Sequence, residues 1–234
     1  DLDAALELLT VELLGDFGFA DEASIANALG LLILPFVRER INGPTPLHIV
    51  RAPDIGSGKS FLATACLIPS CGMPSVISGT KNEEEWRKRI TAALMSGTNA
   101  IFLDNLSGKL DSASLAAALT GGFWEDRILG ESTMAKVPVR NAWVATGNNL
   151  ALAPEQVRRA VPIFLDPGDV RPDLRDQEKA FNHPDLLEWA QAERAQLAEA
   201  ALTIVRHWLD GPAHAEGGWL YQRTGEDPIL GRRN

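Results

Sequence analysis

The feature that most constrains this chain is a glycine-rich segment between an apolar run and a helix-forming stretch. The apolar run covers residues 47–50, and the segment after it reads Pro53-Asp54-Ile55-Gly56-Ser57-Gly58-Lys59-Ser60, followed by Phe61. Two glycines let backbone amides turn inward around phosphate oxygens, and the start of a helix adds its dipole. The sequence therefore predicts a phosphate-binding loop that joins a strand to a helix.

The residue types in this loop suit a nucleoside triphosphate. We assign Lys59 to the β- and γ-phosphates, and the hydroxyl of Ser60 to Mg²⁺, which prefers oxygen ligands. We assign the whole run from Pro53 to Phe61 to nucleotide binding. Pro53 stands where the usual pattern has its first glycine, so an ordinary glycine-rich turn between a strand and a helix remains the alternative.

The rest of the chain alternates short apolar runs with helical patterns, which predicts an α/β fold. Strands that are covered on both faces form continuous apolar runs, so we expect a mainly parallel, five-stranded sheet between two helical layers. The five runs are residues 47–50, 75–78, 100–103, 143–146 and 161–165. We expect an N-terminal helical segment (1–44), an α/β core (45–170), and a C-terminal helical lid with a tail (171–234).

Two of the expected strands end in polar residues. Asp104 follows the run at 100–103, at the carboxyl end of a strand, where a carboxylate can hold Mg²⁺. Asn148 and Asn149 follow the run at 143–146. In phosphate-loop ATPases with an additional strand in the middle of the sheet, this position carries the polar residue that orients the attacking water. We assign Asn148 first and Asn149 second, with a plain Asn-Asn turn as the alternative.

Two adjacent arginines, Arg158 and Arg159, precede the last expected strand. A guanidinium that a neighbouring subunit offers to the γ-phosphate acts as an arginine finger, because it meets the charge of the transition state. Exposed arginines on a solvated helix are the alternative interpretation, and the sequence does not choose between the two arginines.

Taken together, these motifs resemble those of AAA+ ATPases, and more closely the helicase-like modules of phage and mobile-element primases and replication proteins. The resemblance covers about residues 20–210, and it implies a five-stranded sheet with a helical lid, ATP and Mg²⁺ between subunits, and a ring that is usually a hexamer. The motifs are Gly56-Ser57-Gly58-Lys59-Ser60, Phe102-Leu103-Asp104-Asn105, Ala145-Thr146-Gly147-Asn148-Asn149 and Arg158-Arg159-Ala160-Val161-Pro162-Ile163.

One position departs from that family. AAA+ proteins usually follow the strand-ending aspartate with a glutamate that acts as general base, whereas this chain has Asn105, whose amide cannot accept a proton at neutral pH. Our hypothesis is a relocated glutamate from the run at residues 83–85, with Glu84 as the assigned residue. An acidic helix start, which the helix dipole favours, is the alternative.

The segment between Asp126 and Asn141 predicts two short strands around a polar turn. In ring helicases that resemble this chain, a hairpin at this place projects into the central channel and grips the DNA backbone. We assign Lys136 to that contact and Lys109 as a weaker second, and a solvated lysine on the hairpin surface is the alternative. In a ring, such lysines contact phosphate rather than bases.

Composition limits the partners. With 31 acidic and 22 basic side chains the formal charge is −9, which excludes a basic coat over the whole surface, so any contact with DNA must be local. Two cysteines cannot form a disulfide framework or a four-ligand zinc site. The longest apolar run has about ten residues, so we expect no membrane span, no signal peptide and a cytoplasmic protein. Because Asp1 stands first, we expect part of a longer protein.

These observations leave more than one function open. We expect a DNA-translocating ATPase of a phage or mobile element that uses single-stranded DNA. A replication initiator or loader with weak turnover is the first alternative, which Asn105 favours. A nucleotide-gated oligomerisation module without motor activity is the second. A small-molecule kinase fits less well, because it leaves the arginine pair unexplained.

Overall fold

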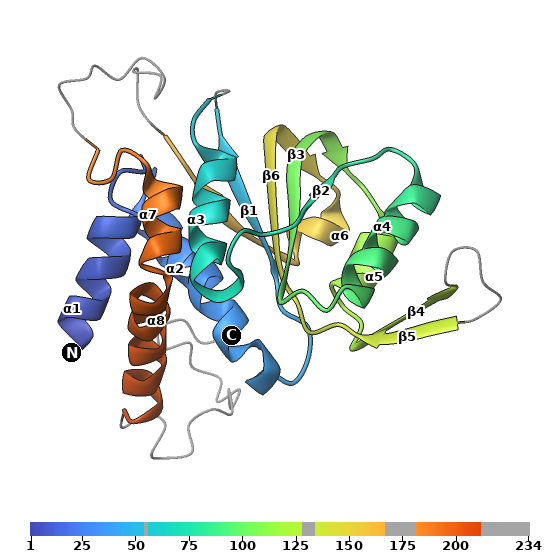
Figure 1. Ribbon diagram of the computed structural model, residues 1–234. Coiled ribbons are helices and arrows are strands. Elements are labelled where there is room, and N and C mark those ends of the chain that lie inside the picture. The colour runs from blue at the N-terminus through green and yellow to red at the C-terminus, as the bar shows by residue number, and fades with distance from the viewer. Residues whose placement is uncertain (54–55, 128–133, 167–180, 212–234) are drawn as a thin grey trace, which may run out of the picture.

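The computed structural model describes residues 1–53, 56–127, 134–166 and 181–211 (Figure 1). Helices and strands follow one another along the chain as α1 (Leu2–Glu7), the π-helical η1 (Leu8–Leu13), α2 (Glu22–Val37), the 3₁₀ turn η2 (Arg38–Arg40), β1 (Leu47–Ala52), α3 (Lys59–Cys71), β2 (Val76–Ser78), α4 (Glu83–Met95), β3 (Ala100–Leu110), α5 (Ala113–Ala118), β4 (Phe123–Arg127), β5 (Met134–Pro138), β6 (Ala142–Leu152), α6 (Pro154–Val157), β7 (Ala160–Phe164), α7 (Leu186–Ala192) and α8 (Arg194–Leu209).

Five of the strands form one sheet in the order β2-β3-β6-β1-β7, and every neighbouring pair is parallel. This confirms the predicted α/β fold with a mainly parallel sheet. Strand β6 lies between β1, which leads into the glycine-rich loop, and β3, which carries Asp104. Because all five strands run the same way, their carboxyl ends meet at one edge of the sheet, and their amino ends meet at the other.

Helices cover both faces of the sheet, and each face has its own core. In Figure 1, α1, α2, α3, α7 and α8 lie on one side of the sheet, while α4, α5 and the β4–β5 hairpin lie on the other. On the first side, Val144 and Phe102 pack with the α3 residues. On the second side, Trp143 and Ile101 pack with Trp86 of α4. This division follows from the alternation of side chains along each strand.

The two central strands are longer than their apolar runs predicted. Strand β3 continues to Leu110 and β6 to Leu152, past the polar residues at which we expected both to end. The register between them shifts after Leu103, where Asn105 adopts a positive φ of 53°, which marks a β-bulge. Pairing resumes beyond the bulge because it buries Leu106 and Leu110.

The predicted long helix after residue 184 is interrupted. Helix α7 ends at Ala192 and α8 begins at Arg194, with Glu193 between them at φ −92° and ψ 14°. Both helices contribute to the same core as α2 and α3, with Leu186 and Leu197 fully or almost fully buried. The C-terminal helices therefore pack with the N-terminal ones on one face of the sheet.

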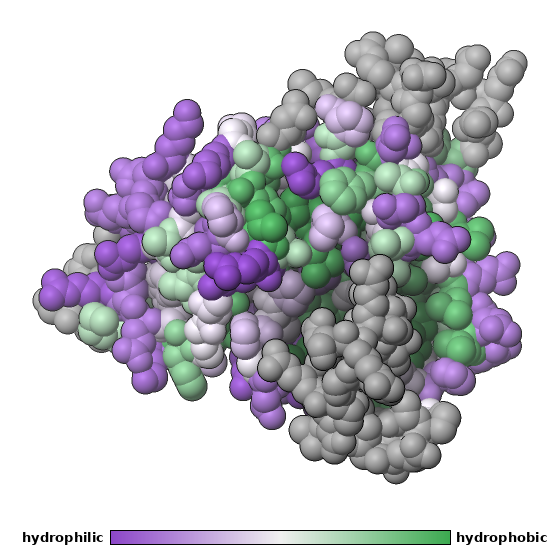
Figure 2. Space-filling view, turned by 180° about the vertical axis from the view of Figure 1, so that it is seen from behind, coloured by the Kyte–Doolittle hydropathy of each residue, from purple (hydrophilic) through white to green (hydrophobic). Residues whose placement is uncertain are grey.

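The β4–β5 hairpin stands apart from the main sheet as a separate antiparallel pair. Two strands precede β6 as expected, but the first of them begins at Phe123, before the segment in which both were predicted, and the turn between them lies outside the described residues. Figure 2 shows the molecule from behind: the hairpin end is mostly hydrophilic on this face, and hydrophobic residues gather over the middle.

Candidate functional site

The glycine-rich loop lies at the carboxyl end of β1 and runs into α3. Gly56 and Gly58 have φ angles of 81° and 82°, a left-handed conformation that glycine adopts without a steric penalty. Lys59 is buried, with 8% of its surface exposed, and its Nζ donates a hydrogen bond to Ser57 Oγ at 2.8 Å. Pro53 is exposed at the start of the loop, while residues 54 and 55 lie outside the described ranges. The loop thus holds an ammonium group beside the start of a helix.

A hydroxyl–carboxylate cluster joins this loop to the neighbouring strands. Ser60 Oγ donates to Asp104 Oδ1 at 2.5 Å, and Thr146 Oγ1 donates to the same oxygen. The backbone N–H of Asn105 donates in turn to Thr146 Oγ1 at 3.0 Å. Ser60 and Asp104 are far apart in the sequence, and the structure brings them together as predicted.

Thr146 had no predicted role, because in this segment the sequence pattern pointed only to the asparagines at 148 and 149. Its side chain is 1% exposed and lies on the face of β6 that carries Val144, which is the face covered by α3. The available signal was a hydroxyl residue inside an otherwise apolar strand, since a buried polar group requires a hydrogen-bond partner.

Asn148 lies beside Ala52, the last residue of β1, in the register of the β1–β6 pair. Its Oδ1 is buried and has no hydrogen-bond partner among the described residues. Such an orphaned acceptor is costly unless a ligand or water satisfies it. This favours Asn148 as a group that faces a bound molecule; of Asn149 only the backbone is described.

The contacts of the glutamates at residues 83–85 do not support the hypothesis of a relocated general base. Glu83 accepts a hydrogen bond from Ser114 N, and Glu84 forms an ion pair with Lys88 at 2.9 Å. That ion pair lowers the pKa of Glu84, whose side chain is 70% exposed. Glu85 pairs with Arg89 at 3.1 Å. Each carboxylate therefore has a partner in α4 or α5, so these contacts do not favour Glu84 as the general base, and nothing in the structure tests that assignment.

The arginine pair lies at the opposite edge of the sheet from the glycine-rich loop. The carbonyl of Arg159 accepts a hydrogen bond from Leu47 N at the amino end of β1. Arg158 is exposed, and Arg159 donates to Glu155 O. The six residues of β1 separate the pair from the loop by roughly 20 Å. Neither arginine can therefore contact a phosphate held by Lys59 of the same chain.

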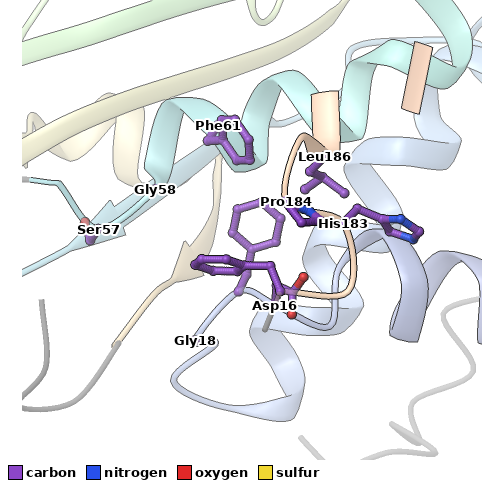
Figure 3. A pocket seen from close by; sticks show the side chains of 10 residues that line it. Asp16, Gly18, Ser57, Gly58, Phe61, His183, Pro184 and Leu186 are labelled. Carbon is purple, nitrogen blue, oxygen red and sulfur yellow. The ribbon is translucent and has the colours of Figure 1, made fainter. Parts of the chain in front are cut away.

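A cavity of about 210 Å³ opens beside the glycine-rich loop (Figure 3). Three segments that are distant in sequence form its wall, and their side chains are mainly aromatic or aliphatic. The rings of Phe17 and Phe61 lie 6.2 Å apart. The cavity is lined by Asp16, Phe17, Gly18, Ser57, Gly58, Phe61, Phe181, His183, Pro184 and Leu186. Flat apolar walls of this kind suit a planar ring.

Hydrogen bonds and a stacked ring hold the third segment of this wall in place. Asn182 N donates to Asp16 Oδ2 at 2.8 Å, and Asn182 Nδ2 donates to Val11 O at 3.0 Å. His183 lies 3.0 Å from a Glu12 carboxylate oxygen and stacks on Trp189 at 3.7 Å between ring centroids. The start of the C-terminal helical segment is therefore fastened to the N-terminal helices.

Lys136 lies on the hairpin, where it pairs with Glu125 at 2.6 Å. Lys109 pairs with Asp111 at 2.6 Å on the extended part of β3. Both ion pairs are exposed, so they contribute little and a phosphate can compete with them. The hairpin position of Lys136 is confirmed, and its contact with DNA remains a prediction.

None of the helices in the described residues is both long and apolar enough to cross a membrane. The described residues also contain no group of three or more His, Cys, Asp or Glu side chains that could hold a metal ion. Any metal at Asp104 would therefore need ligands such as a hydroxyl, water or phosphate.

The comparisons with known proteins found likenesses only among solved structures. No protein-family model matches the chain, and no curated protein matches it. One similar structure is a JCV helicase with a bound acetamide compound, at 15% identity and a TM-score of 0.45, covering 91% of this chain and 63% of that one. A second JCV helicase structure has 13% identity and a TM-score of 0.46, covering 88% of this chain and 68% of that one. This chain thus spans less than two thirds of the first of them.

Proposed function

We propose that this chain is an ATP-hydrolysing module of the AAA+ type that acts on DNA as part of a helicase or primase-helicase of a phage or mobile element. The observation that carries the proposal is the hydrogen bond between Ser60 and Asp104, at the end of a loop that also buries Lys59. A cation, a hydroxyl and a carboxylate at one edge of a parallel sheet are the groups that bind a nucleoside triphosphate with its metal.

Mg²⁺ fits these side chains. A serine hydroxyl and a carboxylate are hard oxygen ligands, and phosphate oxygens and water would complete the coordination. In our proposal Ser60 and Asp104 hold the ion, and Thr146 orients the carboxylate through the hydrogen bond to Oδ1. When bound, the ion neutralises charge on the phosphates.

The remaining assignments follow from the surrounding groups. Lys59 binds the β- and γ-phosphates, while the aromatic cavity beside Gly58 takes the base of ATP. Asn148 uses its unpartnered Oδ1 to orient the water that attacks the γ-phosphate. Phosphoryl transfer depends mostly on positioning and charge stabilisation, so oriented amides can contribute without accepting a proton.

The proposal includes a ring, because the site of one chain is incomplete. Arg158 or Arg159 would stabilise the transition state only from a neighbouring copy, since both lie at the far edge of their own sheet. A hexamer is the assembly that the resemblance implies. In such a ring the hairpins with Lys136 would face a central channel that holds single-stranded DNA.

A replication initiator or loader with weak turnover is the second candidate. Asn105 favours it, because this residue occupies the bulge after Asp104 and brings no carboxylate to the site. A loader would bind ATP and assemble on DNA without strand displacement.

The test is steady-state ATP hydrolysis with and without single-stranded DNA, at low and moderate salt. We expect hydrolysis that DNA stimulates and that Lys59→Ala abolishes. Lys81→Ala is the matched control, because Lys81 is exposed outside the loop. ATP binding without turnover under every condition would favour the loader, and absence of ATP binding would contradict both candidates.

A further inference from the structure

The β4–β5 hairpin has two faces: one packs against the rest of the protein, and the other is exposed to solvent. Its register pairs Trp124 with Val137 and Asp126 with Ala135, so these residues share one face. Trp124, Asp126 and Ala135 are each 8% exposed or less. This inner face packs against the protein.

Hydrogen bonds fix the inner face to α4. Arg87 donates to both oxygens of Asp126, and Thr91 Oγ1 donates to Asp126 Oδ2 at 3.2 Å. The indole N–H of Trp124 donates to Thr91 Oγ1 at 2.8 Å. The hydrogen bonds from Arg87 also lower the pKa of Asp126. These hydrogen bonds hold the hairpin in one orientation, in which its outer face is exposed to solvent.

The outer face carries exposed apolar groups together with cations. Phe123 and Met134 are 61% and 57% exposed. Lys136 Nζ lies 5.3 Å from the centroid of the Phe123 ring, and Arg127 is exposed opposite Met134 in the register. Glu125 is the one acidic side chain among the described residues of this face.

An exposed phenylalanine with a cation beside it can bind a partner that has both an aromatic face and a negative charge. Single-stranded nucleic acid matches this combination, because its unpaired bases have open π-faces and its backbone carries phosphates. Duplex DNA matches it less well, because its base faces are already stacked.

We propose that the outer face of the β4–β5 hairpin is a stacking platform for an unpaired base, with Phe123 contacting the base and Lys136 and Arg127 contacting the flanking phosphates. This inference rests on the nucleic-acid partner of the proposed function, and it goes beyond the phosphate contact assigned to Lys136. Most of the Phe123 ring stays accessible at 61% exposure, and the ion pair between Lys136 and Glu125 is exposed enough to yield to a phosphate.

The test separates base contacts from phosphate contacts. Fluorescence anisotropy would measure the affinity of the chain, with ATP and Mg²⁺, for a labelled oligo-dT and for an abasic oligonucleotide of equal length and charge. The variants are Phe123→Ala, Phe123→Trp and Lys136→Ala. Phe164→Ala is the matched control, because Phe164 is also exposed and also lies under a cation, Arg51, at 5.8 Å.

We expect wild-type protein to bind oligo-dT about fivefold or more tightly than the abasic strand, as stacking of one base contributes. Phe123→Ala should remove that preference, Phe123→Trp should keep it, and Phe164→Ala should not change it. Lys136→Ala should weaken both complexes alike and reduce their salt dependence.

Three results would overturn the platform. The first is equal affinity of wild-type protein for both oligonucleotides, which leaves the proposed function intact if DNA still stimulates ATP hydrolysis. The second is no binding of either oligonucleotide. The third is a change of oligomeric state in Phe123→Ala, measured by light scattering, without a change in the preference for bases. That result would assign the face to a contact between copies.

Discussion

The two edges of the central sheet differ in their charge and in how that charge is satisfied. At the carboxyl edge, Ser60, Asp104 and Thr146 form hydrogen bonds with one another. At the amino edge, Arg38 and Arg159 donate to backbone carbonyls instead. Among the described residues, neither arginine forms an ion pair with a carboxylate.

The difference between the two edges bears on the ring that we propose. In the proposed function the carboxyl edge binds phosphate and an arginine of the amino edge stabilises the transition state, yet the length of the strands keeps the two edges apart within one copy. A head-to-tail contact between copies would bring them together, and such a contact closes into a ring or grows into a filament.

The largest expected effect comes from mixing variants of the two edges. Lys59→Ala and either Arg158→Ala or Arg159→Ala should each lower ATP turnover by about a thousandfold. A mixture of the lysine variant with the effective arginine variant should regain measurable turnover, because each copy supplies the edge that the other lacks. ATP hydrolysis across mixing ratios is the measurement.

Arg40→Ala is the control for that experiment, because Arg40 is exposed in the segment that leads to β1. Its variant should keep nearly full turnover. If both arginine variants keep full turnover, or if no mixture recovers, the amino edge has no part in hydrolysis.

The next effect concerns the carboxyl edge alone. Ser60→Ala should lower turnover by about a hundredfold and raise the Mg²⁺ concentration needed for half-maximal rate, because a ligand of the ion is lost. Ser70→Ala is the matched control, since Ser70 lies at the other end of α3 and contacts Leu67 O. Equal Mg²⁺ dependence of the two variants would exclude Ser60 as a ligand.

A third effect is on stability, and it tests the amino half of β1. His48 is 5% exposed there, and desolvation lowers its pKa from 6.5 to about 4. The folded state therefore favours the neutral imidazole. As far as His48 is concerned, the free energy of unfolding has its full value above pH 6.5 and falls as the pH drops from 6.5 toward 4. A shift of this size corresponds to at most about 3 kcal/mol.

Denaturant unfolding at pH 7 and at pH 5 measures this loss. In His48→Leu the part of the pH dependence that belongs to the imidazole should disappear, while the part that belongs to carboxylates remains. An unchanged slope in the variant would show that His48 does not titrate across this range.

The smallest effect is expected for Glu84→Gln. The side chain is 70% exposed and pairs with Lys88 on the helix surface, so turnover should change by less than about twofold. Steady-state hydrolysis by this variant, beside Glu85→Gln, checks it. A loss of tenfold or more in Glu84→Gln alone would instead support the relocated general base.

The sequence predicted the parts of the fold that depend on local pattern. The glycine-rich loop and the five strands could be recognised, because glycine at positive φ and continuous apolar runs are local requirements. The place of Asp104 directly after the apolar run of β3 also followed from the sequence, although the strand itself continues to Leu110. These features needed no knowledge of which segments pair.

The parts that depend on long-range pairing were not predictable. Strand β3 continues past Asp104 because β6 offers a partner for residues 106–110 and because Asn105 accepts a bulge. Thr146 acquires its role only when β6 is placed beside β3. The cavity could not be predicted for the same reason, since its wall combines residues 16–18 with residues 181–186.

The composition of that wall has a consequence for when the chain acquires its site. Asn182 bonds to Asp16 across 166 residues and to Val11 across 171, and His183 contacts Glu12 across 171. These contacts join residues that are more than 160 positions apart, so they cannot form until both segments have been synthesised. During synthesis the loop around Lys59 can therefore form long before the aromatic cavity does. The wall of the cavity is complete only after residue 186 has been synthesised.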